Sequence, residues 1–109
     1  MKPVVWLGDS LARVRQFAPD AKREAGYQLG QLQAGKDAAD WKPMASVGLG
    51  VNELRVRAGG AHRVVYVAKF AEAVYVLHAF EKKSSKTRRQ DIVLAQLRFR
   101  ALIRERRQE

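Results

Sequence analysis

The spacing of hydrophobic positions predicts a short strand at residues 3–6 followed by two helices. Apolar residues recur at helical spacing over residues 10–18, which predicts a short amphipathic helix that Asp9 or Ser10 can cap. Pro19 suits the first turn of a second helix. This second helix has its apolar face at positions 21, 25, 29 and 32, and Gly35 is placed to end it.

Several residues in this half of the chain disfavour regular structure. Gly26 and Gly30 lie inside the second predicted helix and weaken it by about 1 kcal/mol each relative to alanine. Close packing against a sheet would explain them. Residues 36–50 contain scattered aspartate, proline and glycine, so this segment is expected to be irregular.

Three strand-like runs follow, at residues 51–57, 62–68 and 73–80. The first run alternates, so that one face carries Glu53, Arg55 and Arg57 and the other carries Leu54 and Val56. In the third run, strict alternation places His78 on one face with Val74, Val76 and Phe80. These runs predict an antiparallel meander.

The turn between the first two runs decides which charged side chains are neighbours. Gly59 and Gly60 supply a hairpin turn. A two-residue turn pairs Arg55 with Val64, whereas a three-residue loop pairs Arg55 with Arg63. The sequence leaves both registers open.

The C-terminal part predicts a basic loop and a final helix. Residues 81–89 carry five basic residues and two serines, which favours a loop. Thr87 and Gln90 have the spacing of a capping box, and an apolar stripe from Ile92 to Ile103 predicts the helix after it. Because strands are grouped rather than alternated with helices, the chain is expected to form an α+β fold, as a single domain over residues 1–109.

The chain is strongly basic. The 109 residues include 21 Lys and Arg against 11 Asp and Glu, a formal net charge of +10. Such an excess in a small domain favours a polyanionic partner, although an acidic protein or an anionic membrane would use the same charge. No apolar stretch is long enough for a signal peptide or a membrane span, so a cytoplasmic location is expected.

The residue types favour chemistry on RNA without a protein-built metal site. The chain has no cysteine, two histidines and scattered acids, so a metal site and a bound cofactor are not expected. The 2′-hydroxyl of RNA can attack its neighbouring phosphate if the enzyme aligns the strand, moves protons and stabilises negative charge. The meander and the segment after it offer catalytic candidates: Glu53, Arg55, Arg63, His78 and Lys82.

Three ordered strings resemble a known family. They are Gly50-Val51-Asn52-Glu53-Leu54-Arg55, then His62-Arg63-Val64-Val65-Tyr66, then Val76-Leu77-His78-Ala79-Phe80-Glu81-Lys82-Lys83. Together with Lys42-Pro43 and Asp91-Ile92, they resemble the phage-derived, HigB-like branch of the RelE/ParE toxins over nearly the whole chain.

The resemblance implies a compact RelE-like domain and the function of a type II toxin. It implies ribosome-dependent cleavage of mRNA without a metal ion, and a HigA-like helix-turn-helix antitoxin as partner. By this similarity Arg55, Arg63, Lys82 and Lys83 contact phosphates, and His78 or Glu53 transfers protons. The remaining predicted RNA contacts are basic side chains of the same region: Arg57, Lys86 and Arg88.

Two other functions remain open from the sequence. A non-enzymatic inhibitor of DNA gyrase, like the ParE toxins, would also be basic. A nucleic-acid-binding module without toxicity would use the same charge. His78 could also be a hydrogen-bonded structural residue, Glu53 could neutralise a nearby arginine, and His62 beside the turn is expected to be a solvated surface residue.

Overall fold

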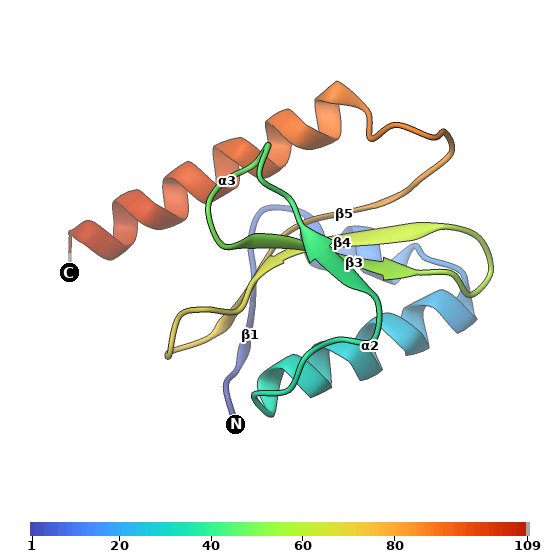
Figure 1. Ribbon diagram of the computed structural model, residues 1–109, viewed down its shortest axis with the longest axis horizontal. Helices are drawn as coiled ribbons and strands as arrows, with labels where there is room; N and C mark the ends of the chain where they lie inside the picture. Colours follow the sequence, from blue (N-terminus) through green and yellow to red (C-terminus); the bar gives the residue numbers. More distant parts are fainter. Residues whose placement is uncertain (109) are drawn as a thin grey trace.

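A computed structural model of the protein describes residues 1–108 and confirms the α+β fold. The elements in chain order are β1 (Val4–Trp6), α1 (Ser10–Arg15), α2 (Pro19–Gln33), β2 (Trp41–Pro43), β3 (Val51–Val56), β4 (His62–Val67), β5 (Val74–Glu81) and α3 (Arg89–Arg107). The strands form one mixed sheet in the order β1-β5-β4-β3-β2. Helix α2 lies along one face of the sheet and α3 along the other (Figure 1).

Two hydrophobic clusters, one on each face, hold these layers together. Between the sheet and the first two helices, Leu54, Val64 and Val76 pack against residues such as Ala25 and Leu29. The second cluster joins the other sheet face to α3 and to the loop before β3, through Val65, Leu77, Ala95, Leu102 and Met44. The sheet is therefore buried on both sides, which explains why β4 reads as a nearly continuous apolar run.

Proline and glycine set the limits of the two N-terminal helices. Ala18, which precedes Pro19, has the extended ψ of 148° that a residue before proline favours, so α1 ends at Arg15 rather than near residue 18. Pro19 begins α2 as predicted. Gly35 follows the helix with a φ of +82°, which confirms its predicted role in ending α2.

The segment predicted to be irregular contains a strand. Residues Trp41–Pro43 form β2, which pairs antiparallel with β3 at the edge of the sheet. The prediction was wrong here because three residues are too few to show an alternating pattern. This pairing places Lys42 opposite Glu53.

The two cap predictions based on side chains were also wrong. The residue before α3 is Arg88 rather than Thr87, and no side chain caps this helix. Asp9 precedes α1, but its carboxylate binds Arg13 and Arg98 instead of the backbone of the helix. Both helices therefore depend on packing and on side-chain ion pairs at their first turns.

The meander has the register that places two arginines opposite each other. Arg55 pairs with Arg63, which is the register predicted for a three-residue loop. Between β4 and β5 the register shifts, because Val65 opposes His78 whereas Tyr66 opposes Val76. This bulge breaks the predicted alternation. Ala79 lies in the cluster on the α2 side, and the side chain of His78 turns to α3 instead.

The two glycines inside α2 do not pack closely against the sheet. A Cβ atom at Gly26 or Gly30 would meet no atom within 4 Å, so the predicted explanation was wrong. We expect Gly26→Ala and Gly30→Ala each to raise the free energy of unfolding by about 1 kcal/mol, because alanine favours the helix. Urea denaturation measures this change.

A third glycine in the same region serves as the matched control. Gly35→Ala should lower the free energy of unfolding, since its φ of +82° strains any residue with a Cβ atom. If all three substitutions destabilised the protein alike, the assignment of open space around α2 would be incorrect.

Candidate functional site

Two buried charges of opposite sign meet on the α3 side of the sheet. Glu53 of β3 is 3% exposed and Arg63 of β4 is 7% exposed. The Arg63 Nε atom lies 3.5 Å from Glu53 Oε1, and in the described part of the chain neither atom has a hydrogen-bond partner. Burial lowers the pKa of Arg63, and the charge of Glu53 opposes that effect. A buried charge with incomplete hydrogen bonding lowers the stability of the fold. Such a group is often kept because it serves a ligand or a reaction.

A pocket opens beside Glu53. Its volume is about 320 Å³. The edge strand β2, the loop after it and the loop between β5 and α3 line it, with Lys42, Ser46, Lys82, Ser85 and Lys86 among its residues. We call this hollow the Glu53 pocket. Its positive side chains surround a single carboxylate, an arrangement suited to a bound phosphate.

Lys42 is a residue of this pocket that the site prediction missed. Its Nζ atom lies 3.7 Å from Glu53 Oε1. The only signal in the sequence was Lys42-Pro43 as part of the family resemblance, because nothing local indicated that this segment pairs with β3.

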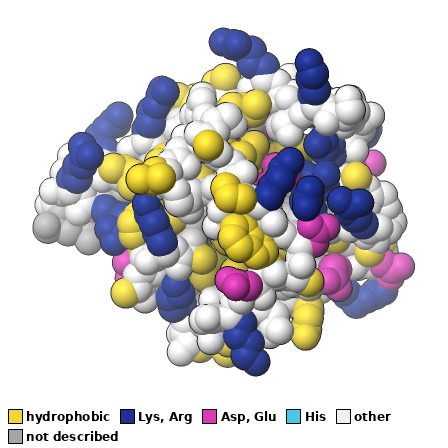
Figure 2. Space-filling view, viewed as in Figure 1, with side chains coloured by type: hydrophobic (Ala, Val, Ile, Leu, Met, Phe, Trp, Pro, Cys, Tyr) yellow, Lys and Arg dark blue, Asp and Glu magenta, His cyan; other side chains and the backbone are white. Residues whose placement is uncertain are grey.

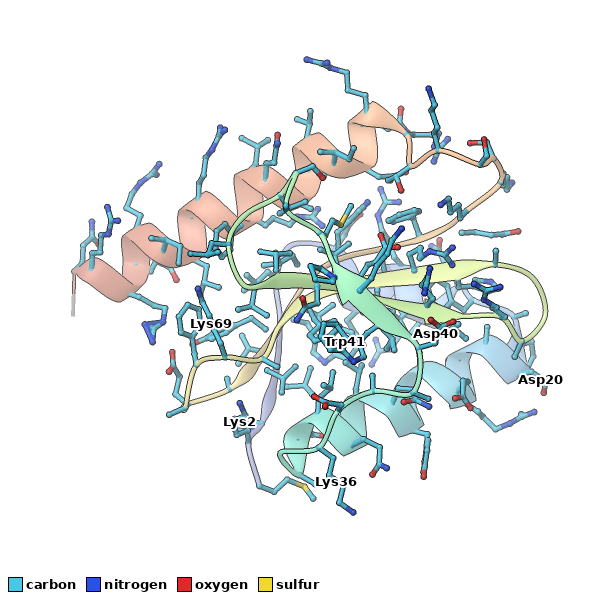
Figure 3. The ribbon with its side chains drawn as sticks, in the orientation of Figure 1. Lys2, Asp20, Lys36, Asp40, Trp41 and Lys69 are labelled. Carbon is cyan, nitrogen blue, oxygen red and sulfur yellow. The ribbon has the colours of Figure 1, made fainter. Side chains whose placement is uncertain are left out.

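Arg55 and Arg57 are bound by an acidic residue that the sequence did not single out. Asp40 accepts from Arg55 Nε at 2.9 Å and lies 2.8 Å from Arg55 Nη2. The other oxygen of Asp40 lies 3.3 Å from Arg57 Nε. Figure 3 shows Asp40 among basic side chains near the β3–β4 end of the sheet, and Figure 2 shows Lys and Arg interleaved with acidic side chains there. Asp40 therefore orients both guanidinium groups and offsets their charge.

His78 lies apart from the pocket, with no exposed surface. Its Nε2 atom is 2.8 Å from Asp91 Oδ1, and Arg98 Nη1 is 3.2 Å from its Nδ1 atom. Because arginine can only donate, Nδ1 is the acceptor and Nε2 carries the proton that binds Asp91. Both ring nitrogens are thus occupied, and the side chain joins β5 to α3.

The burial of His78 predicts a pH-dependent stability. Burial lowers the pKa of His78 below its usual value of 6.5, against the opposing effect of Asp91. The unfolded chain therefore binds this proton more readily, so stability is complete above about pH 6.5 and falls as the pH drops toward 5. The urea midpoint should decrease over this range. In His78→Gln the decrease should be smaller; an identical decrease in the variant would contradict the assignment.

The remaining predicted residues of the segment after β5 divide between two larger hollows, while all four also line a small hollow of about 20 Å³. Lys82 and Lys86 line the Glu53 pocket, whereas Lys83 and Arg88 line a different hollow beside α1. His62, expected at the surface, is only 2% exposed and packs its ring against Phe17 at 4.5 Å between centroids. That expectation was wrong because Phe17, in the turn between α1 and α2, packs against the start of β4.

The comparison with known families decides the membership of this chain. The family model described as Phage derived protein Gp49-like (DUF891) matches residues 12–100, which include every predicted site residue. The chain belongs to this Gp49-like family. The family is part of the RelE/HigB-like toxin superfamily and indicates a toxin of a toxin–antitoxin system. No curated protein matches the chain.

The described residues of this Gp49-like protein contain neither a membrane-spanning helix nor a cluster of metal ligands. None of the helices in residues 1–108 combines the length and apolar character needed to cross a bilayer. Within the same range, no three His, Asp or Glu side chains gather as a group that could hold a metal ion.

Proposed function

We propose that this Gp49-like protein is the toxin of a type II toxin–antitoxin system and cleaves mRNA on the ribosome, as in the HigB-like branch of its superfamily. The observation that carries this proposal is the buried Glu53–Arg63 pair beside a lysine-lined pocket. A carboxylate among cations offers the two capacities that RNA cleavage needs, which are proton transfer and stabilisation of negative charge.

The proposed reaction uses the RNA's own 2′-hydroxyl as nucleophile. Glu53 accepts its proton while the 2′-oxygen forms a bond to phosphorus and the bond from phosphorus to the 5′-oxygen breaks. Lys82 donates a proton to the departing 5′-oxygen. Arg63, with Lys42 and Lys86, stabilises the charge that builds on the phosphate. The step is complete without a metal ion or a cofactor.

The other predicted residues have supporting roles in this proposal. Arg55 and Arg57, oriented by Asp40, contact the RNA backbone at the mouth of the site. His78 stays outside the chemistry, since its side chain is fully buried and both of its nitrogens are bonded.

The proposed partners follow from the charge and the family. A net charge of +10 suits the ribosome and mRNA. A HigA-like helix-turn-helix protein is the proposed antitoxin, and the cytoplasm is the compartment where mRNA and ribosomes occur.

Expression of the protein without an antitoxin tests this function. Primer extension on messages from arrested cells should show cuts at codon-linked positions. Cleavage by the purified protein should require translating ribosomes. DNA damage signalling with intact messages would favour gyrase inhibition instead. Unimpaired growth would contradict a toxin of either kind and favour a simple nucleic-acid-binding module.

A further inference from the structure

A second hollow lies outside the Glu53 pocket, between α1, the end of β5 and the loop after β5. Its volume is about 230 Å³. The charged residues that line it are Arg13, Glu81, Lys83 and Arg88. We call it the Arg13 pocket. Three cations thus face one carboxylate in a hollow to which the proposed cleavage reaction assigns no role.

Two arginines of this pocket are each held at their Nε atom by an aspartate. Arg13 donates from Nε to Asp9 Oδ2 at 2.8 Å, and Arg88 donates from Nε to Asp91 Oδ2 at 3.3 Å. In the described residues, the terminal Nη atoms of both arginines have no protein partner. Each guanidinium is therefore anchored at its base, with its outer donors available to a ligand.

The two anchors are joined by a continuous set of hydrogen bonds that begins at the surface and passes through the buried His78. Asp9 Oδ1 accepts from Arg98 Nη2 at 2.6 Å, and Arg98 Nη1 donates to His78 Nδ1 at 3.2 Å. His78 Nε2 completes the connection by donating to Asp91 Oδ1 at 2.8 Å. We call this connected set of hydrogen-bonded side chains the polar row. In order of contact, its members are Arg13, Asp9, Arg98, His78, Asp91 and Arg88.

The polar row gives the Arg13 pocket a fixed geometry and an excess positive charge. Two of its members, His78 and Asp91, are 0% and 1% exposed, so neither can turn toward water. With a neutral histidine, three arginines and two aspartates leave a net charge of +1 (3 − 2). Both of its ends line the same pocket, where an anion would meet two preorganised guanidinium groups.

We propose that the Arg13 pocket binds a backbone phosphate of the RNA strand, with Arg13 and Arg88 as its ligands and Lys83 at its rim. The choice of RNA rests on the proposed function, while the choice of a phosphate rests on the paired guanidinium groups. The loop after β5 borders both hollows, since Lys82 lines the Glu53 pocket and Lys83 the Arg13 pocket. A strand crossing this loop would occupy both.

Binding of a non-cleavable 2′-O-methyl RNA octamer tests the proposal. Fluorescence anisotropy on the full-length protein should show affinity roughly threefold to tenfold weaker for Arg13→Gln and for Arg88→Gln. Each change should also reduce the salt dependence by about one phosphate contact. The matched control is Arg23→Gln, on the exposed side of α2 and paired with Asp20, which should bind like the unmodified protein. Unchanged affinity in both pocket variants would overturn the proposal.

Nuclear magnetic resonance separates the possible occupants. Titration with inorganic phosphate should move the Nε–H signals of Arg13 and Arg88 together and leave that of Arg23 in place. The RNA octamer should move the same two signals. Movement with free phosphate or with polyglutamate, but not with RNA, would overturn the assignment of an RNA strand.

The outcomes also separate this proposal from the proposed function. The unmodified protein could fail to cut mRNA while Arg13→Gln and Arg88→Gln still weaken octamer binding. That result would support the phosphate site and contradict the proposed nuclease activity. Ribosome-dependent cleavage by the unmodified protein, with unaltered octamer binding in Arg13→Gln and Arg88→Gln, would support the nuclease activity and contradict the phosphate site.

Discussion

Arg63→Ala is expected to lower the rate of ribosome-dependent mRNA cleavage by roughly 100-fold or more. Arg63 is the cation that lies 3.5 Å from the proposed proton acceptor Glu53, at a site shielded from water where a fixed positive charge acts strongly on a phosphate. Removal of one such donor costs about 100-fold to 1,000-fold in other enzymes. Single-turnover cleavage of a defined message on stalled ribosomes measures the rate.

Two further variants separate chemistry from folding. Arg63→Ala also removes the buried cation beside Glu53 and leaves it only the more distant, exposed Lys42, so the stability of the variant must be measured in parallel. Lys82→Ala removes a charge from the half-exposed loop, where we expect little change in stability and a similar loss of rate. Arg23→Ala on α2 is the matched control and should cleave normally. Undiminished cleavage by both Arg63→Ala and Lys82→Ala would contradict the assigned site.

His78→Leu is expected to lower the free energy of unfolding by about 3 kcal/mol. Leucine has similar size but no polar atom, so Asp91 would keep a buried carboxylate oxygen without its donor. Arg98 Nη1 would lose one of its two acceptors and retain the carbonyl of Leu77. Urea denaturation near pH 7.5, where His78 is neutral, measures the loss.

The double variant His78→Leu/Asp91→Leu shows whether the lost partner causes this effect. It should be less destabilised than the sum of the two single variants, by about 1–3 kcal/mol, because no unpaired carboxylate remains. Additive losses would indicate that His78 contributes through packing alone. The same variant should also free Arg88, which loses its acceptor Asp91, whereas Arg13 keeps its bond to Asp9.

Much of the fold follows from the spacing of apolar residues. Helix α3 buries Asp91, Ala95 and Leu102 at helical spacing. The three long strands are short runs rich in valine, and they are buried on both faces. The types of these elements could therefore be predicted from local patterns. Alternation in β3 also predicted that Glu53 and Arg55 share a face. The bulge in β5 could not be predicted, because a single inserted residue depends on the pairing with β4 rather than on β5 itself.

The α+β order of the elements other than β2, the positive charge and the residue types available for RNA chemistry can be read from the chain alone. Which of these residues meet depends on how the chain folds in three dimensions. Pairing of β2 with β3 brings Lys42 to Glu53, and Asp40 takes up the charge of Arg55. The bulge buries His78 against α3, within hydrogen-bonding distance of Asp91. These contacts depend on strand register and on the packing of distant segments, and short-range periodicity carries no information about either.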